Sequence, residues 1–247
     1  MSSCLGVQQQ LPSLLNPPLG FAHRGARAHA RENTIEAFAL ALRLGANSLE
    51  SDVWLTADGI AVLDHDGVVV GRLRRKAIAD VAREALPPHI PTLDELFDQC
   101  GTKFNLSLDL KDPASGAAVV DVVRNHDSAM LNRTWLCDPD RDRVVALRSQ
   151  LPDVRILHST RLARLKSGAE RSAADLSNHG IDGINLHRSE WTGGLVALYH
   201  RFNRVAFGWD MQHEEELRAS LRMGLDAVFS DHVDVMVDAF NSELGRP

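Results

Sequence analysis

Short apolar segments alternate with longer amphipathic segments along most of the chain. The short segments predict buried β-strands, and the longer ones, with apolar residues every three or four positions, predict helices. The expected strands cover residues 19–23, 48–55, 104–110, 134–137, 154–157, 181–186, 204–207 and 227–230. The expected helices cover residues 33–44, 93–99, 115–127, 140–150, 170–178, 192–202, 213–223 and 232–241.

This alternation predicts a parallel sheet with helices outside it. Eight strand–helix units in about 230 residues fit a closed (β/α)8 barrel, so the predicted fold class is α/β, a TIM barrel. A doubly wound open sheet is the alternative, but it usually has fewer strands, and no GxGxxG turn follows the first strand. We expect a barrel domain at 19–247, preceded by a Gln-, Pro- and Ser-rich arm at 1–18.

One segment interrupts the regular alternation. Residues 60–63 form a brief apolar run only a turn after the second strand, whereas a parallel crossover needs a dozen residues or more. We therefore expect a return strand that begins a short excursion reaching residue 90, with a basic, exposed segment at 72–76. Before it, Asn33 and Glu36 form a capping-box pattern at the start of the first helix, and Gly45 ends that helix.

Composition argues against several classes of partner and site. The 247 residues carry a net charge of −6 with scattered basic residues, so we expect no nucleic-acid partner. Cys4, Cys100 and Cys137 are far apart and match no metal or redox spacing. The start lacks a signal-peptide pattern and no apolar run is long enough to span a bilayer, so we expect a cytoplasmic protein without stable membrane insertion. The oligomeric state stays open.

Charged residues gather at the ends of the first three predicted strands. His23 ends the first, Glu50 and Asp52 lie near the end of the second, and Asp109 and Lys111 end the third. Residues i and i+2 of a strand share a face. Because barrel chemistry occurs at the C-terminal mouth, one histidine and three carboxylates should converge there, with Lys111 beside them.

Two arrangements could accommodate three neighbouring carboxylates. A hard divalent cation, Ca²⁺ or Mg²⁺, would neutralise their mutual repulsion through oxygen ligands. Alternatively, Glu50, Asp52 and Asp109 could form a salt-bridge network with Arg24 and Lys111.

The histidines add acid–base chemistry to this mouth. Imidazole titrates near neutral pH, so His23 and His65 could serve as base and acid in one turnover. Arg24 would offer a fork of donors to a phosphate. The other histidines are expected to be ordinary surface or core residues.

These residues belong to a recognisable set of motifs. The run FAHRGARAHARENTIEAFALALRLGANSLESDVWLTADGIAVLDHD resembles the glycerophosphodiester phosphodiesterase family, whose pattern is H-R-G, E-N-T, E-x-D, T-x-D-G and H-D. The resemblance continues through IPTLDELF and LSLDLKD to FGWD and MGLDAVFSDHVD, and so covers nearly the whole chain from residue 19.

The resemblance implies a (β/α)8 barrel that hydrolyses glycerophosphodiesters to an alcohol and sn-glycerol 3-phosphate with a divalent metal. It implies that His23 and His65 are the general acid and base. It assigns Glu50 and Asp52 to the metal, with Asp109 at the third ligand position. Arg24 and Lys111 would contact the phosphate of this small-molecule substrate, and Trp209 would line the mouth.

Two departures keep other functions open. The family usually has glutamate where this chain has Asp109, and aspartate there is similar to the related sphingomyelinase D and phospholipase D-like toxins. The short excursion after the second strand could leave the mouth open to a longer lysolipid. A lysophospholipase D-like enzyme, a barrel lyase or isomerase, and a non-catalytic barrel that binds a phospho-ligand are therefore the alternatives.

Overall fold

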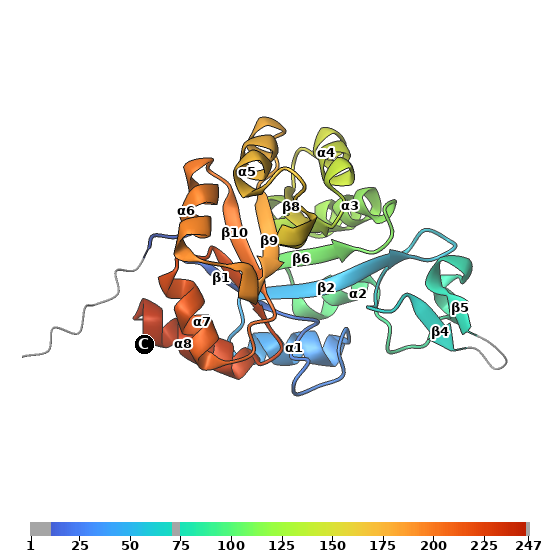
Figure 1. Cartoon of the computed structure of the whole chain (residues 1–247). Coiled ribbons are helices and arrows are strands. Elements are labelled where there is room, and N and C mark those ends of the chain that lie inside the picture. The colour runs from blue at the N-terminus through green and yellow to red at the C-terminus, as the bar shows by residue number, and fades with distance from the viewer. Residues whose placement is uncertain (1–10, 71–74, 246–247) are drawn as a thin grey trace, which may run out of the picture.

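The chain forms a barrel of parallel strands surrounded by helices (Figure 1). The computed structural model describes residues 11–70 and 75–245. The barrel strands are β1 (Leu19–Ala22), β2 (Ser48–Leu55), β6 (Asn105–Leu110), β7 (Thr134–Asp138), β8 (Arg155–Ser159), β9 (Gly183–His187), β10 (Val205–Trp209) and β11 (Ala227–Ser230). The helices are α1 (Ile35–Arg43), α2 (Leu93–Cys100), α3 (Ser115–Asp127), α4 (Arg141–Gln150), α5 (Ala169–Asn178), α6 (Gly193–Arg201), α7 (Glu214–Arg222) and α8 (Val233–Leu244).

The sheet is closed, which confirms the predicted (β/α)8 barrel. β1 pairs in parallel with both β2 and β11, and the remaining parallel pairs follow the order of the strands along the chain. Asp52 on β2 lies opposite Asp109 on β6 in this register. The closed sheet therefore excludes the doubly wound alternative and brings the ends of β1, β2 and β6 together.

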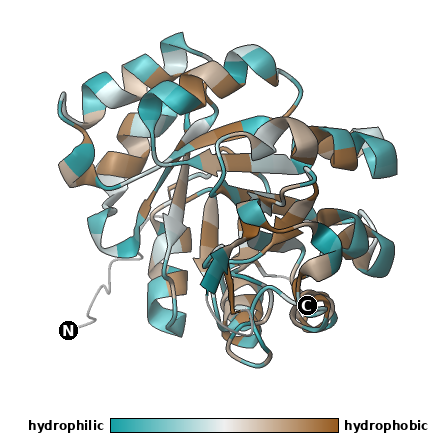
Figure 2. Ribbon diagram, turned by 90° about the vertical axis from the view of Figure 1, so that its right-hand side faces the viewer, coloured by the Kyte–Doolittle hydropathy of each residue, from teal (hydrophilic) through white to brown (hydrophobic). Residues whose placement is uncertain are grey.

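The two faces of the strands meet different cores. Outward residues such as Leu49 and Leu106 pack against the helices in the larger apolar cluster. Inward residues such as Phe21, Trp135 and Phe207 fill the barrel axis in a second cluster. Figure 2 shows the corresponding pattern, with hydrophobic residues on the central strands and hydrophilic ones on the outer parts of the helices. None of the described helices is long and apolar enough to cross a membrane.

The excursion after β2 is short. β3 (Ala61–Leu63) pairs antiparallel with β2, which confirms the return strand, and β4 (Val68–Val70) pairs with β5 (Arg75–Ala77) in a separate hairpin. Of the basic segment predicted at 72–76, residues 72–74 lie outside the described residues, and Arg75 and Lys76 are exposed. The predicted 1–18 arm is described only from residue 11, where the Leu11 N–H donates to the Arg222 carbonyl at 3.0 Å.

The prediction that Asn33 caps the first helix is wrong. Thr34 is the N-cap, and its hydroxyl accepts a hydrogen bond from the Ala37 N–H at 3.2 Å. Asn33 instead has a φ of 53° and is buried. Both residue types cap helices well, so the sequence alone did not distinguish the two positions.

Candidate active site

A cavity of about 650 Å³ opens at the C-terminal mouth of the barrel. Residues from β2, β6, β8, β9, β10 and β11, and from loops that follow the barrel strands, line it. The lining includes every site residue expected from the sequence: His23, Arg24, Glu50, Asp52, His65, Asp109, Lys111 and Trp209. Segments far apart in the chain therefore contribute to one site.

The strand register places three carboxylates side by side. Glu50 and Asp52 point inward from β2 and are 5% and 2% exposed, while Asp109 points inward from the neighbouring β6. One carboxylate oxygen from each of the three lies within 4.8 Å of the others. Oxygen atoms grouped in this way match the ligand preference of Ca²⁺ and Mg²⁺.

Burial makes this group of carboxylates electrostatically costly. Desolvation, reinforced by Asp52 and Asp109, raises the pKa of Glu50 to about 8, although His23 opposes the shift. Desolvation also raises the pKa of Asp109, against the attraction of Lys111. A bound cation would favour the charged forms of both groups, because its positive charge compensates for the hydration lost on burial.

Two cations already contact one of the acids. Lys111 Nζ lies 3.0 Å from Asp52 Oδ1 and 3.4 Å from Asp109 Oδ2. Arg24 Nε lies 3.3 Å from Asp52 Oδ2, and its Nη1 lies 3.1 Å from Glu32. Although burial opposes it, the attraction of Asp109 and Asp52 raises the pKa of Lys111. The salt-bridge alternative therefore describes Asp52 well.

Glu50 differs from Asp52 in this respect. Among residues 11–70 and 75–245, it receives one hydrogen bond, from the Arg24 N–H to Oε2 at 2.9 Å. Burial, not a missing salt bridge, raises its pKa, and a cation shared with Asp109 would compensate for this burial by favouring the charged carboxylate. The donor set therefore fits a hard divalent cation, with Asp52 tied to protein cations as well.

The tight turn after β1 makes the Glu50 contact possible. Arg24 and Gly25 have φ values of 52° and 78°. A Cβ atom on Gly25 would lie 2.7 Å from the Ala37 backbone, so this position requires glycine. The turn directs the Arg24 N–H toward Glu50 and its side chain toward Asp52.

His23 is held by an aspartate from the other side of the barrel closure. Its Nδ1 lies 2.6 Å from Asp231 Oδ1, directly after β11, and its Nε2 lies 3.8 Å from Glu50 Oε2. Burial alone would lower the pKa of His23, but Glu50 and the Asp231 hydrogen bond outweigh burial and raise it. The same hydrogen bond, against the effect of burial, lowers the pKa of Asp231. Nε2 is therefore the nitrogen left to act in the cavity.

His65 has a looser environment. The antiparallel return of β3 carries the chain back to β2, where the Asp64 N–H donates to the Asp52 carbonyl at 3.1 Å. The next residue, His65, lines the cavity with a side chain that is 39% exposed. Its Nδ1 lies 2.8 Å from Asp66, whose side chain is 79% exposed. The two histidines therefore share one cavity but differ in how firmly they are held.

Trp209 lies at the end of β10, on the opposite side of the mouth. The Arg161 guanidinium lies 5.4 Å from its ring centroid, and the His187 ring packs edge-on against it at 4.6 Å. The other tryptophans, Trp54, Trp135 and Trp191, do not line the cavity. Trp209 is therefore the tryptophan that a bound substrate would meet.

Sequence reasoning missed residues that hold the site together. Asp231 orients His23, and Asn33 supports β2, because its Nδ2 lies 3.4 Å from Asp52 Oδ2 and its Oδ1 accepts the Ser51 hydroxyl at 2.7 Å. A signal for Asp231 existed, since it follows the last strand, which must neighbour the first in a closed barrel. The sequence pattern predicts a helix cap at Asn33 and gives no sign of its contact with β2.

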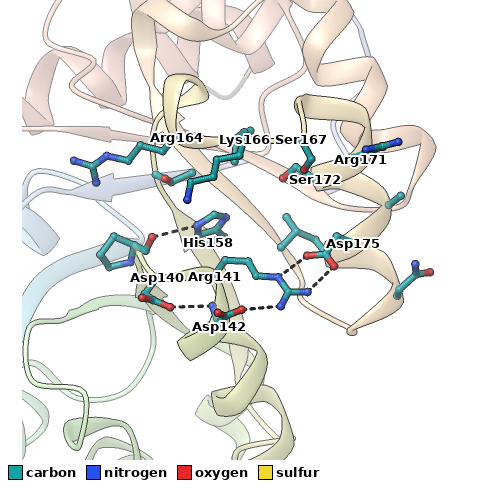
Figure 3. A pocket seen from close by; sticks show the side chains of 16 residues that line it. Asp140, Arg141, Asp142, His158, Arg164, Lys166, Ser167, Arg171, Ser172 and Asp175 are labelled. Atoms are coloured by element: carbon teal, nitrogen blue, oxygen red, sulfur yellow. Dashed lines mark hydrogen bonds and ion pairs between the residues drawn. The ribbon is translucent and has the colours of Figure 1, made fainter.

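A second cavity, of about 700 Å³, lies between the start of α4, the loop after β8 and α5 (Figure 3). Arg141 on its floor pairs with Asp175 at 2.5 Å and with Asp142 at 2.8 Å. None of the three clustered carboxylates of the mouth lines this cavity. Thr160 and Arg164 line both cavities, so the two are adjacent. We assign the chemistry to the mouth.

Comparisons with known proteins give one family. The profile of the "Glycerophosphoryl diester phosphodiesterase family" matches residues 23–235. A glycerophosphodiester phosphodiesterase of Caldanaerobacter subterraneus subsp. tengcongensis is 35% identical over 89% of this chain and 96% of its own length. One from Bacillus subtilis is 29% identical over 90% of this chain and 87% of its own length.

Solved structures share the fold. The glycerophosphodiester phosphodiesterase of Thermotoga maritima has a TM-score of 0.75 at 22% identity, over 90% of this chain and 97% of that one. A phosphodiesterase from Oleispira antarctica, solved in complex with the product sn-glycerol-3-phosphate, has a TM-score of 0.78 at 23% identity, over 91% of this chain and 97% of that one.

Proposed function

The chain belongs to the glycerophosphoryl diester phosphodiesterase family and is a phosphoric diester hydrolase, and from that premise we propose how it works. It hydrolyses glycerophosphodiesters to an alcohol and sn-glycerol 3-phosphate, using a divalent cation and two histidines. The relative from Oleispira antarctica supports this substrate class, because its structure contains sn-glycerol-3-phosphate as the product.

One observation carries the proposal: Glu50, Asp52 and Asp109 cluster in the same cavity as His23 and His65. Glu50, Asp52 and Asp109 would hold Ca²⁺ or Mg²⁺, which supplies positive charge to a phosphate whose negative charge grows during the reaction. Arg24 and Lys111 bind the other phosphate oxygens. Trp209 packs against the organic part of the substrate.

The two histidines move the protons. One takes the proton of the attacking oxygen, and the other gives a proton to the leaving alkoxide, so that one P–O bond forms as another breaks. Asp231 holds Nδ1 of His23, so Nε2 performs its transfer. If the attacking oxygen is the glycerol 2-hydroxyl instead of water, a cyclic phosphate precedes the final product.

The test is hydrolysis of glycerophosphocholine before and after chelation, with Ca²⁺, Mg²⁺ or Mn²⁺ added back. We expect chelation to abolish turnover and one of these cations to restore it. His23→Ala and His65→Ala should each lower kcat by at least about a hundredfold with the cation present, while His213→Ala, a change of an exposed histidine outside the cavity, should leave kcat unchanged. Turnover that resists chelation, or a double histidine variant that keeps full activity, would refute the mechanism.

A lysophospholipid is the second candidate substrate, and the shape of the mouth favours testing it. Among the described residues of the excursion, His65 lines the cavity, whereas residues 66–70 and 75–90 do not. The described part of the excursion thus leaves that side of the mouth uncovered, where an acyl chain would lie. Comparing kcat/KM for lysophosphatidylcholine and glycerophosphocholine separates the two, and a higher value for the lysolipid would replace the smaller substrate in the proposal.

A further inference from the structure

We propose a second metal site, for Zn²⁺ or a similar transition-metal ion, formed by His29, His232 and Asp234 outside the catalytic cavity. One ligand atom from each of these side chains lies within 4.8 Å of the others. None of the three lines the cavity at the mouth. The proposal does not depend on the function proposed above, because it concerns different residues and a different class of ion.

The geometry is close to that of a coordinated ion. His29 Nε2 already lies 3.0 Å from Asp234 Oδ1, and the His29 and His232 rings stand nearly perpendicular with centroids 6.3 Å apart. Two imidazoles that share a tetrahedral Zn²⁺ have centroids roughly 5 Å apart, given a Zn–N distance of about 2.0–2.1 Å. All three side chains are exposed, so small rotations can close the difference and the ion needs no entry path.

The ligand chemistry separates this site from the one at the mouth. Two imidazoles and one carboxylate are typical ligands of Zn²⁺, Ni²⁺, Cu²⁺ or Fe²⁺, whereas the all-carboxylate cluster of Glu50, Asp52 and Asp109 suits Ca²⁺ or Mg²⁺. Each site should therefore select its own class of ion.

An ion at this site would link two segments of the chain. His29 lies on the loop between β1 and α1, and His232 and Asp234 lie at the start of α8. The same loop is joined to this region by the Ala28 N–H, which donates to the Asp231 carbonyl at 3.2 Å, and by Arg27, 3.7 Å from the Asp231 carboxylate. A bound ion would add a further link beside the residue that orients His23.

The experiment is a calorimetric titration of Zn²⁺ into the full chain. The buffer contains millimolar Mg²⁺, which occupies the carboxylate cluster. We expect one Zn²⁺ per chain with a dissociation constant in the micromolar range or below. His29→Ala and His232→Ala should each weaken binding at least about tenfold, since each removes a direct ligand. Zn²⁺ should also raise the melting temperature of the wild type but not of these variants.

Two controls make the result decisive. His213→Ala changes another exposed histidine next to a helix start and should bind Zn²⁺ as the wild type does. Glu50→Gln/Asp52→Asn disables the other cluster and should also leave Zn²⁺ binding unchanged. Binding that survives His29→Ala and His232→Ala, or that disappears in Glu50→Gln/Asp52→Asn, would overturn the proposal, as would no binding at all.

Discussion

The two ends of the barrel both bury carboxylates, but they satisfy them differently. At the N-terminal end, Asp226 is completely buried. Its oxygens lie within hydrogen-bond distance of the hydroxyl of Ser13, the backbone N–H groups of Leu14, Leu15 and Ala206, and the imidazole of His200. At the mouth, Glu50 receives one hydrogen bond among the described residues and has a raised pKa.

This difference separates Asp226 from Glu50, whereas Asp52 at the mouth has cationic partners of its own. A buried carboxylate that is saturated with donors joins segments of the chain, as Asp226 joins the N-terminal residues to β10 and α6. A buried carboxylate with few donors is costly unless a ligand compensates for it. The raised pKa of Glu50, together with its position in the cavity, therefore indicates a site for a cation.

The largest expected effect is on stability, at the N-terminal end. Asp226→Ala should lower the free energy of unfolding by about 3–5 kcal/mol, because it leaves several buried donors without an acceptor. Urea unfolding followed by circular dichroism measures it. At a temperature where the variant is folded, kcat should match the wild type, and a loss below about 1 kcal/mol would show that the network contributes little.

At the mouth, we expect a substitution to lower activity and not stability. Glu50→Gln should lower kcat/KM by at least about a hundredfold, equivalent to about 2.7 kcal/mol of transition-state stabilisation. It should leave the free energy of unfolding of the metal-free protein unchanged or increase it, because it removes a poorly satisfied buried acid. Steady-state kinetics and urea unfolding measure the two quantities. Strong destabilisation without loss of activity would place Glu50 in the same class as Asp226.

The raised pKa of Glu50 predicts a smaller effect, a dependence of the free energy of unfolding on pH. The pKa of Glu50 is raised from 4.5 to about 8 on folding, so the folded state binds the extra proton between these values. The stability from Glu50 is therefore present below about pH 4.5 and is lost as the pH rises toward 8, by at least about 1 kcal/mol without metal. Melting curves from pH 5 to pH 8 should show this decline in the wild type and a weaker one in Glu50→Gln.

Two further substitutions separate the two histidines. Asp231→Asn should lower kcat by about tenfold or more and shift the pH–rate profile, because Asp231 holds His23 at 2.6 Å. Asp66→Asn should change kcat by less than about threefold, because Asp66 is exposed and its pairing with His65 is screened by water. Equal effects of the two changes would mean that the histidines are held equally.

The sequence predicted the barrel and the convergence of the site, since both follow from periodicity and strand order. Glu50 and Asp52 share a face because they are two positions apart, and Asp109 joins them through the β2–β6 register. Strand order also places Asp231 near His23, but the hydrogen bond between these two residues and the role of Asn33 could not be predicted in this way. The role of Asn33 depends on its left-handed backbone conformation, and the hydrogen bond of Asp231 depends on the distance across the barrel closure. Neither feature is encoded in a periodic pattern.

The most direct test compares cation binding by the two kinds of buried acid. Titration calorimetry of Ca²⁺ and Mg²⁺ into chelator-treated wild type, Glu50→Gln and Asp226→Asn measures it, at a temperature where all three are folded. We predict one catalytic-site cation bound by the wild type and by Asp226→Asn, and binding at least about tenfold weaker in Glu50→Gln. Equal binding by the wild type and Glu50→Gln would contradict the assignment of the mouth carboxylates as the metal site.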